Sequence, residues 1–206
     1  DKSVFPRDKV CGGWITPRVL AELKIDPSDY ARERTMQPIT AFRVGCFGGG
    51  AIETSYGTPV SYGIRRREFD DYLLGRCCAR FALGQPLTKL ERSEDGWIAN
   101  DHIRARLIVG AGGHFCPVAR LTGAKSGGEP AVVAQEIEFE MGEAQIARCR
   151  VCKDTPELYF CPDMKGYGWC FRKGNILNVG LGRADSNQLP SHVDGFLKFL
   201  RETGRV

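Results

Sequence analysis

A glycine-rich segment behind a short apolar run is the first feature of the sequence that could bind a ligand. Leu107-Ile-Val109 leads directly into Gly110-Ala-Gly112-Gly113. Because glycine has no Cβ, such a segment lets the backbone approach a bound group closely. Gly110 and Gly112 match half of the dinucleotide-binding fingerprint, but Phe115 stands where its third glycine would be needed. The segment alone therefore does not predict a dinucleotide loop, and a glycine turn leaving a sheet is the default interpretation.

Cysteines are the residues that could bind a metal or carry redox chemistry. Cys149 and Cys152 have the spacing of half a zinc site or of a redox pair. A structural zinc needs two more ligands at short spacing, whereas Cys161 and Cys170 stand alone and the histidines are scattered. We therefore expect no metal site and interpret these cysteines as buried or half-buried strand residues.

Three aromatic residues, Tyr167, Trp169 and Phe171, alternate along a predicted strand and so project from one face. Core packing is the commonest cause of such a stripe, and a wall for an apolar or planar ligand is the alternative. The sequence has no Gly-x-Ser-x-Gly elbow for a hydrolase nucleophile and no P-loop Gly-Lys-Ser/Thr. Residue types alone therefore assign no catalytic residue.

The composition excludes several classes of protein. The chain has 206 residues, 42% hydrophobic and 26% charged, which are ordinary values for a globular protein. Its 29 basic and 25 acidic residues are well mixed, and the basic run Arg65–Arg67 is followed at once by Glu68, so nothing indicates nucleic-acid binding. No apolar run has the length of a membrane span and no signal peptide is expected. The nine cysteines, an odd number, favour a reduced, cytoplasmic protein.

The elements that must position these residues mix helix and strand patterns. The clearest helix is predicted over 66–81, where Phe69, Leu73, Cys77 and Phe81 share a face. A hairpin is predicted around Ser93–Gly96, followed by a short buried strand over 106–109.

The second half of the chain predicts an antiparallel sheet. Residues 132–140 alternate, with Val133, Ile137 and Phe139 on one face and the glutamates Glu136, Glu138 and Glu140 on a wet face. Further strands are expected over 157–162, 168–172 and 175–182, and a final helix from Ser191. The fold class is therefore α/β of a mixed α+β kind.

Four segments occur in an order and spacing typical of one family. They are Phe5-Pro-Arg-Asp-Lys-Val-Cys-Gly-Gly13, Arg66-Arg-Glu-Phe-Asp70 with Leu73, Val109-Gly-Ala-Gly-Gly113, and Tyr167-Gly-Trp-Cys-Phe-Arg-Lys-Gly174 followed by Asn178-Val-Gly-x-Gly182. The first, second and fourth resemble the Pro-Arg-x-Lys-x-Cys-Gly, Arg-x-x-Phe-Asp-x-x-Leu, and Tyr-x-Trp-x-Phe-Pro-Lys-Gly with Asn-Val-Gly-x-Gly signatures of geranylgeranyl reductase-like FAD-dependent oxidoreductases. The third stands where the wider flavin monooxygenase-like fold of these enzymes carries Gly-Ala-Asp-Gly. Gly112 replaces the usual acidic residue of this family and Arg172 the usual proline.

The resemblance implies a Rossmann-like FAD-binding domain, incomplete in this chain, interleaved with an antiparallel β-sheet substrate domain. Residues 1–35 and 63–125 would belong to the first domain, and residues 36–62 and 126–190 to the second. The helix over 191–206 would border the FAD domain. We expect the chain to be an internal fragment, because the family's Gly-x-Gly-x-x-Gly strand and its later Gly-Asp segment are both missing. The chain alone would then be an incomplete flavin site.

The resemblance also implies roles for residues on the cofactor side. Asp1 would accept hydrogen bonds from the adenosine ribose, and Arg7 would lie along the phosphate-ribose stretch. Cys11, Gly12 and Gly13 would run near the isoalloxazine. Further cofactor contacts would come from Arg66, Gly110 and Gly112.

On the substrate side, Tyr167, Trp169 and Phe171 would line a cavity that suits a prenyl chain. The implied activity is hydride transfer from reduced FAD to a carbon–carbon double bond of an isoprenoid or other apolar substrate. The electron donor would be NADPH or a ferredoxin-type protein, and a prenyl-lipid substrate would bring peripheral membrane contact.

Two alternatives remain open. One keeps the fold and changes the reaction to that of a flavin-dependent monooxygenase or halogenase. The other is a non-catalytic binding domain, metal-stabilised through Cys149 and Cys152.

Overall fold

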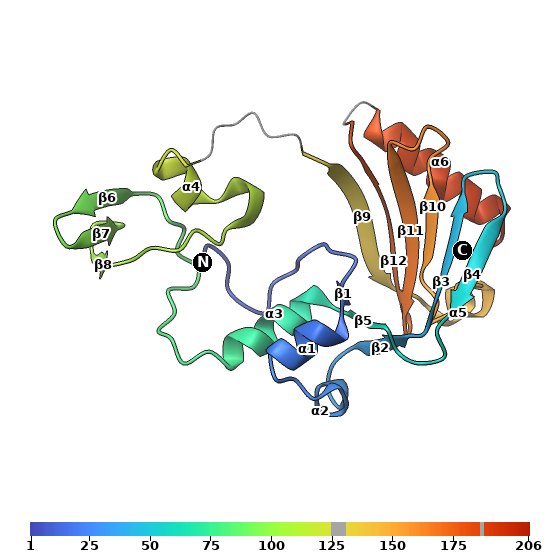
Figure 1. Ribbon diagram of the computed structural model, residues 1–206, viewed down its shortest axis with the longest axis horizontal. Helices are drawn as coiled ribbons and strands as arrows, with labels where there is room; N and C mark the ends of the chain where they lie inside the picture. The colour runs from blue at the N-terminus through green and yellow to red at the C-terminus, as the bar shows by residue number, and fades with distance from the viewer. Residues whose placement is uncertain (125–130, 186–187) are drawn as a thin grey trace. The chain divides into compact units, whose positions relative to one another are not determined.

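The chain forms two compact units in a computed structural model that describes residues 1–124, 131–185 and 188–206 (Figure 1). The small unit comprises residues 1–7 and 76–130, and the sheet unit comprises residues 8–75 and 131–206. These units are defined by how compactly the chain packs, whereas the predicted domains are defined by family resemblance. The predicted domain boundaries therefore stay a prediction. The mixed α/β class, with several sheets, is confirmed.

The sheet unit is built on a six-stranded sheet of order β4-β3-β10-β11-β12-β9. Neighbouring strands are antiparallel except for β3 and β10, which are parallel. The strands span Ala41–Cys46 (β3), Ala51–Ser55 (β4), Val133–Glu140 (β9), Glu157–Phe160 (β10), Gly166–Lys173 (β11) and Ile176–Arg183 (β12). The predicted strands of the second half of the chain are therefore confirmed, within a few residues at their ends.

One face of this sheet packs against helix α6 (Leu189–Glu202), which runs along it in Figure 1. Leu177, Val179 and Leu181 alternate along β12 and are buried in one core with Phe196 and Leu200 of the helix. Burying each such side chain stabilises the fold by about 1.5–3 kcal/mol. Since alternate residues of a strand point to opposite faces, the intervening residues of β12 lie on the other face.

A second, three-stranded sheet of order β1-β5-β2 also belongs to the sheet unit. Its strands are Trp14–Ile15 (β1), Met36–Ile39 (β2) and Ser61–Ile64 (β5), and it is accompanied by the helices Pro17–Glu22 (α1), Pro27–Ala31 (α2) and Arg66–Gly75 (α3). Leu20, Tyr30, Ile64 and Phe69 are buried together between these elements. Because β5 leads directly into α3, the side chain of Arg66 is fixed beside the end of the strand. A further short helix, Glu143–Arg148 (α5), follows β9.

The helix predicted over 66–81 is shorter than expected. Helix α3 ends at Gly75, and Cys77, Cys78 and Phe81 are exposed outside it. At this point the chain leaves the sheet unit. Because a helix depends mainly on packing of its apolar face, a longer α3 would have lost the core that stabilises it.

The small unit contains a three-stranded antiparallel sheet of β6 (Leu90–Ser93), β7 (Gly96–Ala99) and β8 (Ile103–Ala105), a 3-10 turn, η1 (Gly113–Phe115), and helix α4 (Pro117–Leu121). The predicted hairpin is confirmed, with its turn between Ser93 and Gly96. The strand predicted over 106–109 is wrong: the third strand lies earlier, and Leu107 and Val109 are 78% and 75% exposed. A buried strand needs a neighbour to hydrogen-bond, and this segment pairs with none of the described strands.

Within the described ranges, no helix combines the length and apolarity that crossing a membrane requires.

Candidate functional site

The aromatic residues of β11 form a distinct patch on the six-stranded sheet. Tyr167, Trp169 and Phe171 lie on the face opposite α6, and the first two rings are 6.0 Å apart between centroids. Their exposure decreases along the strand, from 44% at Tyr167 through a half-buried Trp169 to 3% at Phe171. The strand therefore presents an apolar wall that is accessible at one end and closed at the other.

Glycines of β12 make room for the indole of Trp169. Gly180 lies opposite Trp169 in the register, and a Cβ added to Gly180 would be 2.3 Å from Cζ2 of that ring. The indole Nε1 donates a 2.7 Å hydrogen bond to Oδ1 of Asn178, which is fully buried. The ring is thus fixed in both position and orientation.

A shallow hollow of about 200 Å³ extends the wall at its accessible end. It is lined by Val132, Phe160, Met164, Lys165, Gly166, Tyr167, Gly182, Arg183 and Ala184. A larger hollow of about 400 Å³ lies on the β6–β7–β8 sheet of the small unit, where it is lined by none of the predicted site residues.

The cations of the sheet-unit hollow are neutralised within the fold. Arg183 contacts Asp163 at 2.7 Å and Asp185 at 2.8 Å, and Lys165 lies 3.4 Å from Asp185. The hydrogen bond from the Arg183 guanidinium lowers the pKa of Asp163 to about 2. Two cations and two carboxylates therefore leave this hollow without net charge.

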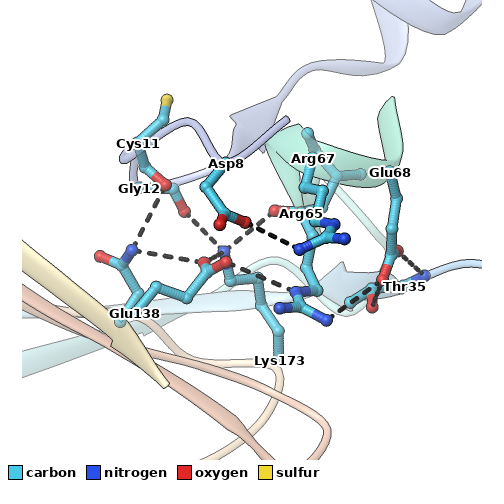
Figure 2. Close-up of polar contacts among 11 residues, drawn as sticks. Asp8, Cys11, Gly12, Thr35, Arg65, Arg67, Glu68, Glu138 and Lys173 are labelled. Carbon is cyan, nitrogen blue, oxygen red and sulfur yellow. Dashed lines mark hydrogen bonds and ion pairs between the residues drawn. The ribbon is translucent and has the colours of Figure 1, made fainter. Parts of the chain in front are cut away.

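Lys173, at the end of β11, is a buried cation that joins three separate segments (Figure 2). Its side chain is 0% exposed and forms an ion pair with Glu138 of β9. Its Nζ also donates hydrogen bonds to the carbonyl oxygens of Gly12 (3.1 Å) and Ile64 (2.9 Å). A buried ammonium must be paired and hydrogen-bonded in this way, since its desolvation is otherwise too costly.

The predicted wet face of β9 is wrong at two of its three glutamates: Glu140 is exposed as predicted, and Phe139 of the predicted inner face packs against the core. Glu136 and Glu138 are half-buried, whereas Ile137 on the supposed inner face is 57% exposed. Glu138 lies opposite Asn178 in the register, on the face of the aromatic wall, and its Oε1 is 3.5 Å from Nε of Arg65. The local alternation could not reveal this, because the cations that draw these glutamates inward come from β11 and from the residue before α3.

The Cys11–Gly13 segment is held against this polar cluster. The carbonyl oxygen of Cys11 accepts a 3.3 Å hydrogen bond from Nδ2 of Asn178. Gly13 has φ +64° and a Cβ there would lie 2.0 Å from the carbonyl oxygen of Ile64, so only glycine fits. Gly12, by contrast, has no atom within 4 Å of the position that a Cβ would take, so open space lies beside its backbone.

Arg66 braces the same segment from α3. Its guanidinium binds Asp70 through two contacts, of 2.7 and 3.0 Å, and its Nη1 lies 3.7 Å from Sγ of Cys11. The hydrogen bond to Asp70 raises the pKa of Arg66 further, so the cation is permanent. The structure thus brings together four of the predicted cofactor residues, Cys11, Gly12, Gly13 and Arg66, beside the aromatic wall.

The other predicted cofactor residues belong to the small unit. Asp1 accepts a 2.8 Å hydrogen bond from the amide of Ser3, and the guanidinium of Arg7 lies 4.8 Å from the ring centroid of Phe5. Cβ atoms added to Gly110 and Gly112 would lie 3.1 and 3.0 Å from atoms of Cys116, so these glycines let the segment fold onto the start of α4. Their cofactor roles remain predictions.

The sequence did not predict four polar residues beside the aromatic wall as site residues: Glu136, Glu138, Lys173 and Asn178. We call these four residues the polar cluster. Lys173 and Asn178 stand inside the family signatures of β11 and β12, which was the available signal. Glu136 and Glu138 could be found only from the strand register, which places them opposite Gly180 and Asn178.

Nine cysteines are free thiols in the structure. Cys149 is half-buried, Cys161 and Cys170 are buried, and Cys152 is exposed. Throughout the described ranges, no group of three or more histidine, cysteine, aspartate or glutamate side chains could hold a metal ion.

Comparison with known proteins gives sequence relatives among lipid and quinone reductases. No family model matches the chain. The digeranylgeranylglycerophospholipid reductase of Methanococcus vannielii is 28% identical over 172 residues, covering 77% of this chain and 43% of that protein. The reductase of the same name from Methanocaldococcus jannaschii is 29% identical, covering 74% and 43%. The menaquinone reductase of Mycobacterium tuberculosis is 27% identical over 215 residues, covering 94% and 50%.

Solved structures share the fold. A geranylgeranyl bacteriochlorophyll reductase-like protein from Thermoplasma acidophilum aligns with a TM-score of 0.74 at 20% identity, over 100% of this chain and 55% of that one. The flavin-dependent halogenase CmlS aligns with a TM-score of 0.63 at 19% identity, over 98% and 40%.

The chain spans only 43% of the length of the two archaeal reductases it matches. Its signatures, its relatives and its fold nevertheless agree. The chain is similar in sequence to archaeal digeranylgeranylglycerophospholipid reductases, and it shares its mixed α/β fold with a geranylgeranyl bacteriochlorophyll reductase-like protein and a flavin-dependent halogenase.

Proposed function

We propose that the chain is part of an FAD-dependent oxidoreductase that reduces carbon–carbon double bonds of an isoprenoid or other apolar substrate. The observation that carries this proposal is the aromatic wall of β11 lying beside the fixed Cys11–Gly13 segment, in a chain whose relatives are named as reductases. An apolar wall with a few fixed polar groups is the usual form of a small-molecule site.

The open space beside the backbone of Gly12 supports the placing of a planar cofactor there. The backbone of Gly12 is open on its Cβ side, while its carbonyl is held by Lys173 and the neighbouring carbonyl by Asn178. We propose that Cys11, Gly12, Gly13 and Arg66 hold the redox-active side of FAD, and that Asp1, Arg7, Gly110 and Gly112 of the small unit serve its nucleotide side. When bound, reduced FAD would supply hydride.

The substrate side is proposed to be Tyr167, Trp169 and Phe171 with the adjoining hollow. These residues exclude water and orient an apolar chain by contact, since Trp169 is fixed by Asn178. The hollow beyond Tyr167 carries no net charge because its cations are paired, which favours an uncharged part of the substrate there.

The proposal also includes the electron donor and the place of the protein in the cell. NADPH or a ferredoxin-type protein would reduce the flavin, and the substrate would be drawn from a membrane by peripheral contact. Nine free thiols support a reducing compartment, the cytoplasm.

The test is product analysis with the complete gene product that contains this chain. Purified protein with FAD is reduced chemically, incubated without oxygen with a lipid that bears geranylgeranyl chains, and the product is analysed by mass spectrometry. Gain of two hydrogens per reduced double bond is expected. A protein that binds FAD and leaves every double bond intact refutes the proposal.

The second candidate is an oxygen-using flavoenzyme, favoured by the likeness of the fold to the halogenase CmlS. Under air, such an enzyme would consume oxygen and insert oxygen or halogen into an aromatic acceptor. Oxygen uptake coupled to acceptor modification, without alkene reduction, would select this alternative.

A further inference from the structure

Glu136 occupies a central position on the proposed substrate face. It lies on β9 directly opposite Gly180, which in turn lies opposite Trp169. A Cβ added to Gly180 would be 2.5 Å from Cβ of Glu136 and 2.3 Å from Cζ2 of Trp169. The glutamate and the indole therefore flank the same bare stretch of β12.

The carboxyl of Glu136 has an oxygen that the fold leaves without a partner. Its Oε1 is buried and has no hydrogen bond to any described residue. A buried carboxylate oxygen without a donor is costly, and a bound proton removes that cost. Glu138, two residues along the strand, differs in that it is paired with Lys173.

The electrostatic environment of Glu136 also favours its protonated form. Burial raises the pKa of Glu136, and the negative charge of Glu138 raises it further, against opposing effects of Lys173 and Asn178. Glu138 on β9, Lys173 on β11 and the neutral Asn178 on β12 are the polar groups that act on it. A buried carboxyl whose pKa is raised is suited to act as a general acid.

We infer that Glu136 is the proton donor for the double-bond reduction, an inference that rests on the proposed function. As the π bond breaks, one carbon would receive a hydride with its electron pair, the chemistry that bound reduced FAD would supply while becoming oxidised. The other carbon receives the proton of the Glu136 carboxyl and forms the second C–H bond. The Glu136 carboxylate then regains a proton from water, so atoms and charge balance.

The first test compares Glu136→Gln with wild type in the complete gene product carrying FAD. The matched control is Glu140→Gln, a change of an exposed residue on the same strand and face. We expect Glu136→Gln to lower kcat by about 100-fold or more, as loss of a general acid does. Lipid binding and flavin content should stay at wild-type values, and Glu140→Gln should match wild type throughout.

The pH profile adds a readout that a structural role would not move. The wild-type rate should fall as the pH rises through the pKa of Glu136, because only the protonated carboxyl can donate, whereas the residual rate of Glu136→Gln should not show this step.

The second test is independent of turnover. Infrared spectra of the flavin-loaded protein recorded through a pH titration should contain the carbonyl stretch of a protonated carboxyl that persists to higher pH in wild type and in Glu140→Gln than in Glu136→Gln. A wild-type spectrum in which no carboxyl stays protonated above the pH at which an ordinary glutamate ionises overturns the inference, even if Glu136→Gln fails to fold.

The possible results distinguish failure of the role of Glu136 from failure of the proposed function. Suppose that wild type reduces the lipid and that the kcat of Glu136→Gln stays within about threefold of the wild-type kcat. This result overturns the inference about Glu136 and leaves the proposed function standing. Wild type that binds FAD and lipid but reduces no double bond overturns the proposed function and this role of Glu136 with it.

Discussion

Lys173 is the residue on which the geometry of the candidate site depends most. One buried ammonium serves the Cys11–Gly13 segment, the end of β5 and Glu138 at once. These segments are far apart in the sequence, so the contacts of Lys173 join parts of the fold that the chain itself does not connect. The cost of burying its charge is offset only while all three partners are present.

Replacing Lys173 with methionine should destabilise the sheet unit. The change keeps the length of the side chain but leaves Glu138 half-buried without its main counter-charge, which we expect to cost about 3–5 kcal/mol. Urea unfolding followed by tryptophan fluorescence measures the effect. Lys198→Met is the control, since Lys198 forms an exposed pair with Glu202 and its loss should cost about 1 kcal/mol or less. Equal stability of the two variants would refute a central role for Lys173.

Gly180→Ala should displace the indole of Trp169. The new Cβ would overlap Cζ2 of Trp169 and Cβ of Glu136, and we expect a loss of about 1–3 kcal/mol in the free energy of unfolding. The emission of Trp169 should shift as its hydrogen bond to Asn178 is strained. Gly182→Ala is a close control, because the nearest atom to its Cβ position is 3.5 Å away. If both variants have wild-type spectra and stability, the packing of Trp169 over Gly180 is not as described.

At the scale of elements, sequence pattern predicted the strands better than their environments. The alternation of Tyr167, Trp169 and Phe171 correctly indicated one shared face, because period two is a local property. The same kind of pattern misassigned Glu136 and Glu138, since which face of β9 is buried depends on Lys173, a residue of another strand.

Two predictions of where elements form or end were wrong for a related reason. The predicted helix runs past Gly75 and the predicted strand over 106–109 does not form, although both segments carry suitable apolar residues. In each case the local pattern was present and the packing partner was not, and packing supplies most of the stability of such elements.

The β10–β11 turn is fastened to the end of β12 by Arg183, which predicts a pH dependence. Arg183 lowers the pKa of Asp163 from 3.8 to about 2, so the charged form of Asp163 stabilises the fold. This contribution is complete above the unfolded-state pKa near 3.8 and is lost as the pH falls toward 2.

Acid titration of stability tests this ion pair. The free energy of unfolding of wild type should fall between about pH 5 and pH 2 more steeply than that of Asp163→Asn, which cannot lose a charge there. Parallel curves for the two proteins would show that the pair with Arg183 contributes nothing to the fold.

At the scale of the whole molecule, the predicted site residues divide between the two compact units. Cys11, Gly12, Gly13 and Arg66 form one cluster with the aromatic wall in the sheet unit, whereas the predicted nucleotide contacts belong to the small unit. The family signatures identified the fold class and most of this cluster, because signatures record residues that act together across a chain. They could not identify Glu136, whose importance emerges from a cross-strand register and an unpartnered oxygen.

The most direct test of the central claim is the fate of bound flavin when substrate is added without oxygen. The complete gene product is loaded with FAD, reduced chemically and mixed anaerobically with a lipid bearing geranylgeranyl chains, while flavin absorbance is recorded. The absorbance of oxidised flavin should return as double bonds are reduced, with one flavin oxidised for each double bond. Flavin that stays reduced with the lipid, and is oxidised only when oxygen is admitted, would contradict this claim.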